Sequence, residues 1–325
     1  MTTPKRLETI DIGKALLIIS VVLSHEFNSQ KILVHLLNGY MLPLFFLFSG
    51  FFLKPQKSIY QFIYSRIKGI ILPYISLGII ASLCYVPFYS FEKVGTLIIH
   101  ELFSWQTLWF LPVIFFSNII AFIVIKYFSS SYLFYIIPSF IIGSYLDYVN
   151  TNFWLQLDVI PVGTGLCLVG YYIYNSSRCI NIHTPPRIYL IALPIYIGLI
   201  IYTNYKVELR LNHINPIIYF LICTILGLYF ILAISYYITK LKYFHLLLSY
   251  IGKNTLIILA IHMPIFFNMQ NFVRPLFTNQ VFYKIIEMLA IFFGSIIACI
   301  IINKYFYFLI GKNKYEKDND IPSIR

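Results

Sequence analysis

The sequence predicts an all-α protein, a polytopic transmembrane helical bundle of about ten spans with both termini in the cytoplasm. Of its 325 residues, 59% are hydrophobic and only 11% are charged, whereas soluble domains carry about 25% charged residues. The apolar residues are grouped in blocks of roughly 17 to 25, which is long enough to cross ~30 Å of hydrocarbon. In a soluble protein, helices this apolar on every side would lack a second layer to cover them.

Hydropathy places the predicted spans along the whole chain, with short loops between them. They are expected near residues 10–28, 33–53, 69–89, 107–126, 132–148, 157–174, 187–204, 215–238, 250–270 and 284–309. We therefore expect one transmembrane domain over 1–311 and a short polar cytoplasmic tail over 312–325. The first span lacks a small-x-small cleavage site and contains charged residues, so we expect it to be retained rather than removed as a signal peptide.

The positions of the lysines and arginines predict the orientation. Of the 24, 17 fall at the ends and in the loops on the side of the two termini, and Lys14 lies inside the first span. The six on the opposite side are Lys31, Lys93, Lys206, Arg210, Arg274 and Lys284. Because positively charged loops stay in the cytoplasm, this bias predicts cytoplasmic termini and an even number of spans.

Other composition features exclude several kinds of site. The five cysteines are scattered without CxxC pairs, so the sequence predicts neither a disulfide framework nor a metal site. The formal net charge is +12. In a chain this apolar, excess positive charge reports membrane orientation, so we expect the lipid bilayer as a partner and no nucleic acid.

The first span, DIGKALLIISVVLSH from Asp11 to His25, keeps three ionisable side chains in an apolar run. On a helix, Asp11 and Lys14 are i,i+3 neighbours that can pair. Lys14 and His25 are eleven residues apart, so they share a face, ~16 Å from one another at 1.5 Å per residue. Ionisable groups at this depth usually face the bundle interior or a wet cavity. This face therefore predicts the lining of a site that reaches into the membrane from the cytoplasm. Alternatively, Asp11 and Lys14 form an interfacial pair and His25 extends to the outer headgroups.

Further polar and proline-containing segments occur in the later spans. They read MLPLFFLFSGFFL in the second span, RIKGIILPY before the third, LWFLPVIFF in the fourth, LDVIPVGTGLCLVGYYI in the sixth and YIGKNTLIILAIHMPIF in the ninth. The pair Ser49–Gly50 offers a surface for close helix packing. Arg66 and Lys68 lie on the predicted cytoplasmic side, and His262 lies in the middle of the ninth span.

In this order the segments resemble the acyltransferase-3 family of integral-membrane O-acyltransferases, which decorate bacterial surface polysaccharides. The resemblance covers nearly the whole chain and is nearest to the branch of fucose 4-O-acetylase-like proteins. Its landmarks are D-x-x-K-x10-H, M-x-P-x-F-F-x-x-S-G, basic residues before Pro-Tyr, WFLP, and IGKNT followed by a histidine. Each landmark is weak, and the ordered set is specific. The chain departs from many members by Lys14 in place of Arg and by the spacing R-x-K at Arg66 and Lys68.

The resemblance implies an acyltransferase of the bacterial cytoplasmic (inner) membrane. The donor is acetyl-CoA or another acyl-CoA, and no cofactor is permanently bound. The acceptor is a hydroxyl of a surface-polysaccharide sugar, such as O-antigen or capsule, or of a lipid-linked sugar. Arg66, Lys68 and Lys14 are expected to bind the donor phosphates. The resemblance also implies that Lys14 and His25, with Asp11, are catalytic residues. His25 is expected to be the general base because imidazole titrates near neutral pH, and Asp11 is expected to hold Lys14 in place.

Three more residues are predicted to contact the acceptor, each with a structural alternative. His262 can act in a relay or hydrogen-bond between helices. Trp109 can stack on a sugar or anchor its span at the membrane interface. Asp158, at the outer end of the sixth span, can touch the acceptor or be a solvated acid. Ser49 has no base nearby in sequence, so direct transfer is expected rather than an acyl-enzyme.

The alternative function is export of a polysaccharide or lipid-linked glycan. Secondary transporters commonly show internal repeats and broken helices in corresponding positions of two halves, and the sequence shows neither. A purely structural subunit is a third possibility, but it gives no reason for Lys14, His25, Arg66 and His262 to occur together. Turnover of an acyl thioester by the purified protein distinguishes the enzyme from both.

Overall fold

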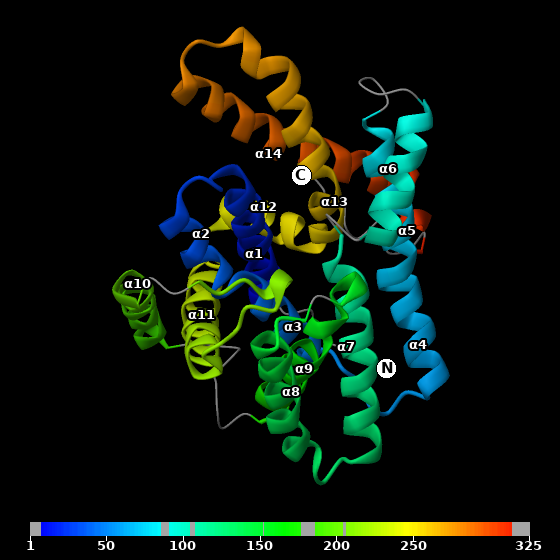
Figure 1. Ribbon diagram of the computed structural model, residues 1–325, viewed down its shortest axis with the longest axis vertical. Coiled ribbons are helices and arrows are strands. Elements are labelled where there is room, and N and C mark those ends of the chain that lie inside the picture. The colour runs from blue at the N-terminus through cyan, green and yellow to red at the C-terminus, as the bar shows by residue number, and fades with distance from the viewer. Residues whose placement is uncertain are drawn as a thin grey trace. The chain divides into compact units, whose positions relative to one another are not determined.

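The computed structural model of the chain describes residues 8–85, 91–104, 108–151, 153–176, 186–203 and 206–313. In these ranges the chain forms α-helices joined by short 3-10 and π-helical turns, with one isolated antiparallel bridge between Glu208 and His213. The predicted all-α class is confirmed. The chain divides into two compact units, unit 1 with residues 1–62 and 116–253 and unit 2 with residues 63–115 and 254–325. Figure 1 labels their helices.

Unit 1 is built around the first and third helices. Its helices are α1 (Glu8–Glu26), α2 (Lys31–Asn38), α3 (Met41–Phe51), α8 (Ile136–Tyr148), α9 (Ile160–Asn175), α10 (Ala192–Thr203), α11 (Ile217–Ile238) and α12 (Lys242–Lys253). Its short 3-10 turns are η3 (Tyr132–Tyr135), η4 (Trp154–Val159), η5 (Arg187–Ile191) and η6 (Leu209–Leu211). Helix α3 packs on α9, and α1 packs on α12, α11 and α3. Two more helices, α4 (Ile59–Arg66) and α7 (Phe110–Tyr127), run across the division between the units.

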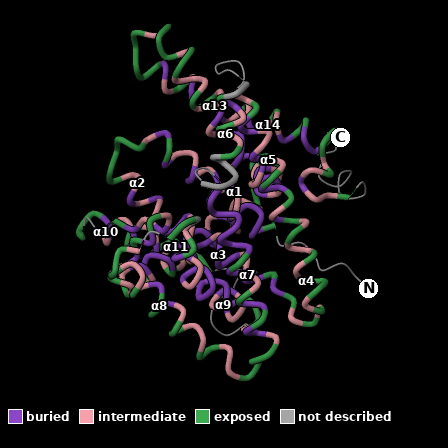
Figure 2. Tube along the Cα trace, turned by 45° about the vertical axis from the view of Figure 1, so that its right-hand side comes forward, coloured by how far each residue is buried: buried purple, intermediate pink, exposed green. Residues whose placement is uncertain are grey.

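The contact between α3 and α9 depends on glycines. A Cβ atom built on Gly50 would lie 2.1 Å from the carbonyl oxygen of Cys167, and one on Gly170 would lie 2.0 Å from that of Leu47. Small residues allow helix backbones to approach this closely. Figure 2 shows most of both helices as buried. The predicted close packing at Ser49–Gly50 is therefore confirmed.

Unit 2 is centred on the packing of α13 against α14 and α5. Its elements are the π-helical turn η1 (Ile67–Ile71), α5 (Leu72–Leu83), α6 (Phe91–Ser104), α13 (Thr255–Asn268), the π-helical turn η7 (Met269–Val273), η8 (Arg274–Leu276), α14 (Gln280–Tyr305) and η9 (Tyr307–Ile310). Helix α5 contacts α6, α13 and η9. Helix α14 begins after Asn279, whose side chain accepts hydrogen bonds from the backbone amides of Val281 and Phe282, as N-cap residues do.

Seven helical segments of the described chain are long and apolar enough to cross a membrane. They are Lys31–Phe51, Ile59–Leu83, Phe110–Tyr127, Gln156–Asn175, Ile217–Ile238, Thr255–Leu276 and Gln280–Tyr305. The other three predicted spans are also helical. Helix α1 carries too many charged residues for this criterion, and η3 with α8 and η5 with α10 are shorter. The cytoplasmic location of both termini stays a prediction.

Two predicted boundaries are wrong. The third span begins at Ile59 instead of near residue 69, because α4 continues through η1 into α5. The ninth span begins at Thr255 instead of near residue 250, because α12 ends at Lys253 and Asn254 separates it from α13. The sequence around Gly252 is apolar enough to read as membrane-spanning, but α12 is a separate helix that packs on α1.

Candidate functional site

Helix α1 places Asp11 and Lys14 as the i,i+3 spacing predicts. Lys14 Nζ lies 3.9 Å from Asp11 Oδ1 and 4.9 Å from the centre of the Phe52 ring. The Asp11 side chain is 5% exposed and that of Lys14 is 27% exposed. The acidic residues Glu8 and Asp11 lie in the first turn of α1 and His25 in the last, which suits the helix dipole. The carboxylate is therefore buried beside an ammonium group that reaches solvent.

Helix α12 packs against the part of α1 that carries Asp11. A Cβ atom on Gly252 would lie 1.8 Å from the carbonyl oxygen of Asp11, so the two backbones are in direct contact. His245 Nε2 lies 3.2 Å from Glu8 Oε2 on the same two helices. Gly252 belongs to the IGKNT segment. Its contact explains structurally why a residue without a side chain stands there.

The face that Lys14 shares with His25 is polar only at its ends. His25 is exposed in the last turn of α1. Ile18 and Val21 lie between the two on the same face, by the helical period, and are only 1% and 4% exposed. The middle of the predicted lining is thus made of packed aliphatic side chains.

The loop before α11 brings further charges to the His25 end of α1. Arg210, in η6, is close enough for its charge to act on His25. Lys206 and Glu208, in the same loop, are close enough for their opposite charges to act on the buried His35 of α2. The surroundings of His25 therefore include a charge from a loop distant in sequence, which the sequence did not predict.

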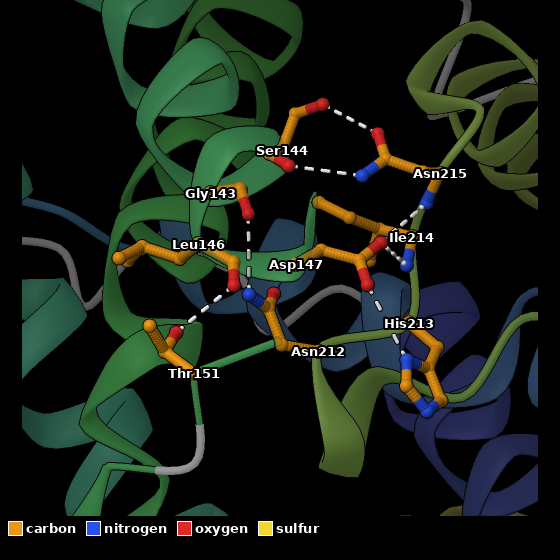
Figure 3. A network of polar contacts seen from close by, with 9 residues as sticks. All are labelled: Gly143, Ser144, Leu146, Asp147, Thr151, Asn212, His213, Ile214 and Asn215. Carbon is orange, nitrogen blue, oxygen red and sulfur yellow. Dashed lines mark hydrogen bonds and ion pairs between the residues drawn. The ribbon is translucent and has the colours of Figure 1, made fainter. Parts of the chain in front are cut away.

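Asp147 fixes that loop to the end of α8, as Figure 3 shows. Its Oδ2 accepts hydrogen bonds of 2.8 Å from the backbone amides of Ile214 and Asn215, and its Oδ1 lies 3.3 Å from His213 Nδ1. Asn212 adds a bond of 3.1 Å to the carbonyl oxygen of Gly143. A carboxylate that accepts two backbone amides is strongly held. Asp147 thereby determines where the segment carrying Arg210 ends.

The three predicted acceptor contacts are all buried. Asp158 and Trp109 are 3% and 6% exposed. The alternative of a solvated acid at Asp158 is therefore wrong. Trp109 packs among the helices, and its role as an acceptor contact or an interface anchor stays a prediction. His262 is also buried, and its Nδ1 lies 3.0 Å from the carbonyl oxygen of Ile258, one turn earlier in α13. Asp158 belongs to unit 1, and Trp109 and His262 belong to unit 2.

Ser49 is held by an amide. Its Oγ donates a hydrogen bond of 2.9 Å to Asn118 Oδ1 of α7. An amide oxygen cannot serve as the base that a serine nucleophile needs. This contact agrees with the expectation of direct transfer, which stays a prediction.

Arg66 and Lys68 flank the start of the π-helical turn η1. Arg66 ends α4, and Lys68 is the second residue of η1. Both side chains are partly exposed, and Lys68 Nζ donates a hydrogen bond of 2.7 Å to Asn313 Oδ1. Single π-helical turns inside α-helices are frequently found at functional sites. The two cations thus stand at an irregular point of a membrane helix.

A polar cluster at the end of α14 was missed from sequence. Lys312 Nζ donates to Asn303 Oδ1 at 2.7 Å and to Asn254 Oδ1 at 3.3 Å, and Asn303 Nδ2 donates to Asn254 Oδ1 at 2.7 Å. Both asparagines are almost fully buried. Lys312, the first residue of the predicted polar tail, is thus hydrogen-bonded to two residues of unit 2, and the domain boundary at residue 311 stays a prediction. Residues 314–325 lie outside the described residues.

A second missed cluster surrounds Glu287 of α14, which is fully buried. Its Oε1 accepts from Gln270 Nε2 at 2.6 Å and from the hydroxyl of Tyr283, and its Oε2 lies 2.8 Å from Lys284 Nζ. Arg274 in turn donates to Gln270 Oε1 at 3.1 Å. The i,i+3 spacing of Lys284 and Glu287 could have predicted their ion pair. Nothing in the sequence indicated the hydrogen bond from Gln270, which lies in the π-helical turn η7.

Comparison with known proteins decides the family. The acyltransferase-3 family, described as "Acyltransferase domain", matches residues 7–304. The chain belongs to this family. It is a multi-pass membrane acyltransferase, and the resemblance read from the ordered segments is confirmed at that level. Curated proteins and solved structures gave no match.

The family assignment implies an acyl donor and an acceptor for this acyltransferase. Within the described ranges, no group of three or more His, Cys, Asp or Glu side chains is placed to hold a metal ion. The matched region contains Asp11, Lys14, His25, Arg66 and His262 and ends just before Lys312.

Proposed function

We propose that this acyltransferase moves an acetyl group from acetyl-CoA to a sugar hydroxyl of a surface polysaccharide or lipid-linked glycan in the bacterial inner membrane. Its proposed place in the family is the branch of fucose 4-O-acetylase-like proteins. The observation that carries the proposal is the arrangement on α1. An ammonium group tied to a buried carboxylate stands at one end of a helix face, and an exposed imidazole stands at the other.

The proposed reaction needs a base and a place for negative charge. His25 accepts the proton of the sugar hydroxyl while that oxygen attacks the thioester carbonyl. The carbon–sulfur bond then breaks, the oxygen keeps the acetyl group, and the CoA thiolate leaves and takes up the proton. Positive charges stabilise the oxyanion that develops on the carbonyl oxygen.

The cations have separate proposed roles. Arg66, Lys68 and Lys14 bind the donor phosphates, for which Arg offers two parallel hydrogen bonds and Lys a point charge. Asp11 keeps the Lys14 side chain in position through the contact at 3.9 Å. The buried His262, Trp109 and Asp158 are proposed to contact the acceptor.

The variant His25→Gln tests the proposed base. Loss of a general base lowers kcat by about 10²–10⁴-fold. The side chain is exposed, so the variant should insert and unfold like the wild-type protein. Mass spectrometry of the surface glycan should show the loss of one acetyl unit. His213→Gln is a matched control, since His213 is also exposed and makes only the longest of the contacts to Asp147. Wild-type acetyl content in His25→Gln would refute the assignment.

Turnover by purified protein tests the reaction class. An exporter does not cleave thioesters. In detergent it also has no membrane gradient to drive transport. The proposal expects free CoA to appear from acetyl-CoA when a sugar acceptor is present. Absence of CoA release with every glycan acceptor that the same cells make would reject it.

A further inference from the structure

Helix α12 (Lys242–Lys253) stands in sequence between two helices that are apolar and long enough to cross a membrane. A short turn separates it from the candidate span Ile217–Ile238 before it, and Asn254 separates it from the candidate span Thr255–Leu276 after it. At 1.5 Å per residue its 12 residues reach ~18 Å, which is too short to cross ~30 Å of hydrocarbon. A helix that follows the end of one span and precedes the start of the next therefore lies at the membrane surface.

One side of α12 packs on α1. A Cβ atom on Gly252 would lie 1.8 Å from the carbonyl oxygen of Asp11, and His245 Nε2 lies 3.2 Å from Glu8 Oε2. Gly252 follows His245 by two helical turns, so both contacts come from the same side of α12. Both reach the first turn of α1. Whatever holds α12 in place therefore also holds the start of α1, where Asp11 pairs with Lys14.

The opposite side of α12 is apolar and exposed. Tyr243 and Leu246 are 81% and 55% exposed, and Leu247 is exposed as well. These three residues are spaced i, i+3 and i+4, which forms one stripe along a helix. An amphipathic helix at a membrane surface buries such a stripe ~5–10 Å into the boundary between headgroups and acyl chains. In this multi-pass membrane protein the stripe therefore fits lipid.

The start of α12 is basic. Lys240 and Lys242 are exposed, and the sequence from 240 to 253 contains no acidic residue. Lys240 lies over the ring of Tyr236, at the end of α11, at 4.7 Å to the ring centre, a contact that leaves its charge in place because the ring has no net charge. Positive charges beside an apolar stripe are attracted by anionic headgroups. Charge complementarity thus favours anionic phospholipid as the partner.

We propose that α12 is an amphipathic helix that lies on the membrane surface and binds anionic phospholipid, and that this binding fixes Asp11 and Lys14 at the start of α1. The lipid contact goes beyond the proposed function, and only its effect on activity rests on that function. The surface is the one at which α1 begins, whichever side of the membrane it faces. The competing occupant of the apolar stripe is protein, including a second copy of this chain.

The variant Tyr243→Trp tests where the stripe lies. The position is exposed, so the new ring should not disturb the packing. Its fluorescence in vesicles of phosphatidylcholine and phosphatidylglycerol is obtained by subtracting the wild-type signal of the three native tryptophans. Phospholipids brominated near the headgroup end of the acyl chains should quench it more than phospholipids brominated near the chain ends, since an interfacial helix enters the bilayer by only ~5–10 Å. An unquenched signal would place protein on the stripe, and stronger quenching by the deep bromines would place α12 inside the hydrocarbon. Either result would overturn the proposal.

The double variant Lys240→Gln with Lys242→Gln tests the choice of lipid. Release of CoA from acetyl-CoA, with a sugar acceptor, is followed in micelles of a neutral detergent as phosphatidylglycerol or phosphatidylcholine is added. We expect phosphatidylglycerol to activate the wild-type protein more strongly than phosphatidylcholine does. The phosphatidylglycerol fraction that gives half-maximal activation should rise about fivefold for each lysine lost. Arginine at both positions keeps the charges and should restore the wild-type value.

Lys304→Gln is the matched control. Lys304 is also an exposed lysine at the end of a candidate span, and it lies over the ring of Tyr305 at 5.1 Å, but it belongs to α14. We expect it to leave the half-maximal phosphatidylglycerol fraction unchanged. An equal rise in Lys304→Gln would mean that the net charge of the protein, and not α12, attracts the lipid, and would overturn the proposal.

Two more results would overturn the proposal. One is equal activation of the wild-type protein by both lipids, and the other is an unchanged half-maximal fraction in the double variant. If the wild-type protein releases no CoA in either lipid, the proposed function fails. The fluorescence of Tyr243→Trp needs no turnover, so it still decides whether α12 lies on the lipid surface.

Discussion

The closest helix contact beside the proposed site is between Gly252 and Asp11, and Gly252→Ala tests what it does. The new methyl group would lie 1.8 Å from the carbonyl oxygen of Asp11, whereas ordinary contacts begin at 3.4 Å. The two backbones would therefore have to separate by about 1.6 Å, the difference between these distances, unless the helices turn. Neither backbone can move alone, because both belong to packed helices.

The size of the effect follows from two opposing terms. Alanine favours a helix over glycine by roughly 0.5–1 kcal/mol, whereas overpacking costs typically ~1–3 kcal/mol. The clash here is with backbone atoms and not with a flexible side chain, so we expect a cost near the upper end of that range. The net result should be a destabilisation of about 2 kcal/mol.

Thermal unfolding in detergent and acyl transfer should be measured on the same preparation. The melting temperature should fall by about 2–4 °C for each kcal/mol lost. Activity should fall even at temperatures at which the variant is folded, because the movement displaces Asp11 and with it Lys14. Gly198→Ala in α10 is the matched control. A methyl group there would have no neighbour within 4 Å, so the protein should be unchanged or slightly more stable.

A melting temperature of Gly252→Ala at or above that of the wild-type protein would refute the reasoning, since it would mean that the helices separate without cost. A destabilised variant with full activity would have a different consequence. The contact between α1 and α12 would then be structural, and the position of Asp11 would be irrelevant to the reaction.

Three further predictions concern the polar groups. Lys14→Ala should raise KM for the donor by roughly tenfold, while Lys14→Arg should be largely tolerated. Complete loss of acyl transfer in Lys14→Arg would show that the shape of the side chain matters more than its charge. Asp147→Asn keeps one oxygen that can accept from both backbone amides, but it loses the charge that strengthens these bonds, which should cost about 1–2 kcal/mol in thermal unfolding and alter activity through the loop that carries Arg210. An unchanged melting temperature would contradict this. Glu287→Gln should lower the free energy of unfolding by about 2 kcal/mol, because three donors that converge on a carboxylate would then meet an amide group. A variant as stable as the wild-type protein would show that Lys284 finds another partner.

Local sequence patterns predicted the helices and the ion pair on α1. The ion pair of Asp11 and Lys14 follows from a spacing of three residues, and the close packing at Gly50 follows from a small residue in an apolar run. Both signals need only neighbouring residues and the period of a helix. For the same reason the boundaries failed at Ile59 and Thr255, where hydropathy alone does not show that one helix continues or that another has ended.

The remaining contacts join residues far apart in the chain. Lys312 meets Asn254, and Asp147 meets the amides of Ile214 and Asn215, across 58 and 67 or more positions. Polar residues near chain ends and in loops are common, and nothing local distinguishes those that fold back. The burial of Asp158 and Trp109 was not predicted for the same reason. Their burial depends on the helices that cover them and not on their own segments.

The packed middle of the α1 face bears on how a donor could reach His25. Ile18 and Val21 separate the Lys14 end from the His25 end, and a phosphate could not enter such apolar surroundings without a large desolvation cost. Under the proposed function the phosphates stay at the Lys14 end, and only the uncharged thioester arm of acyl-CoA would extend toward His25, which requires these packed side chains to move apart. The separation would then keep the charged part of the donor at one end of the helix and deliver only the acyl group to the base at the other.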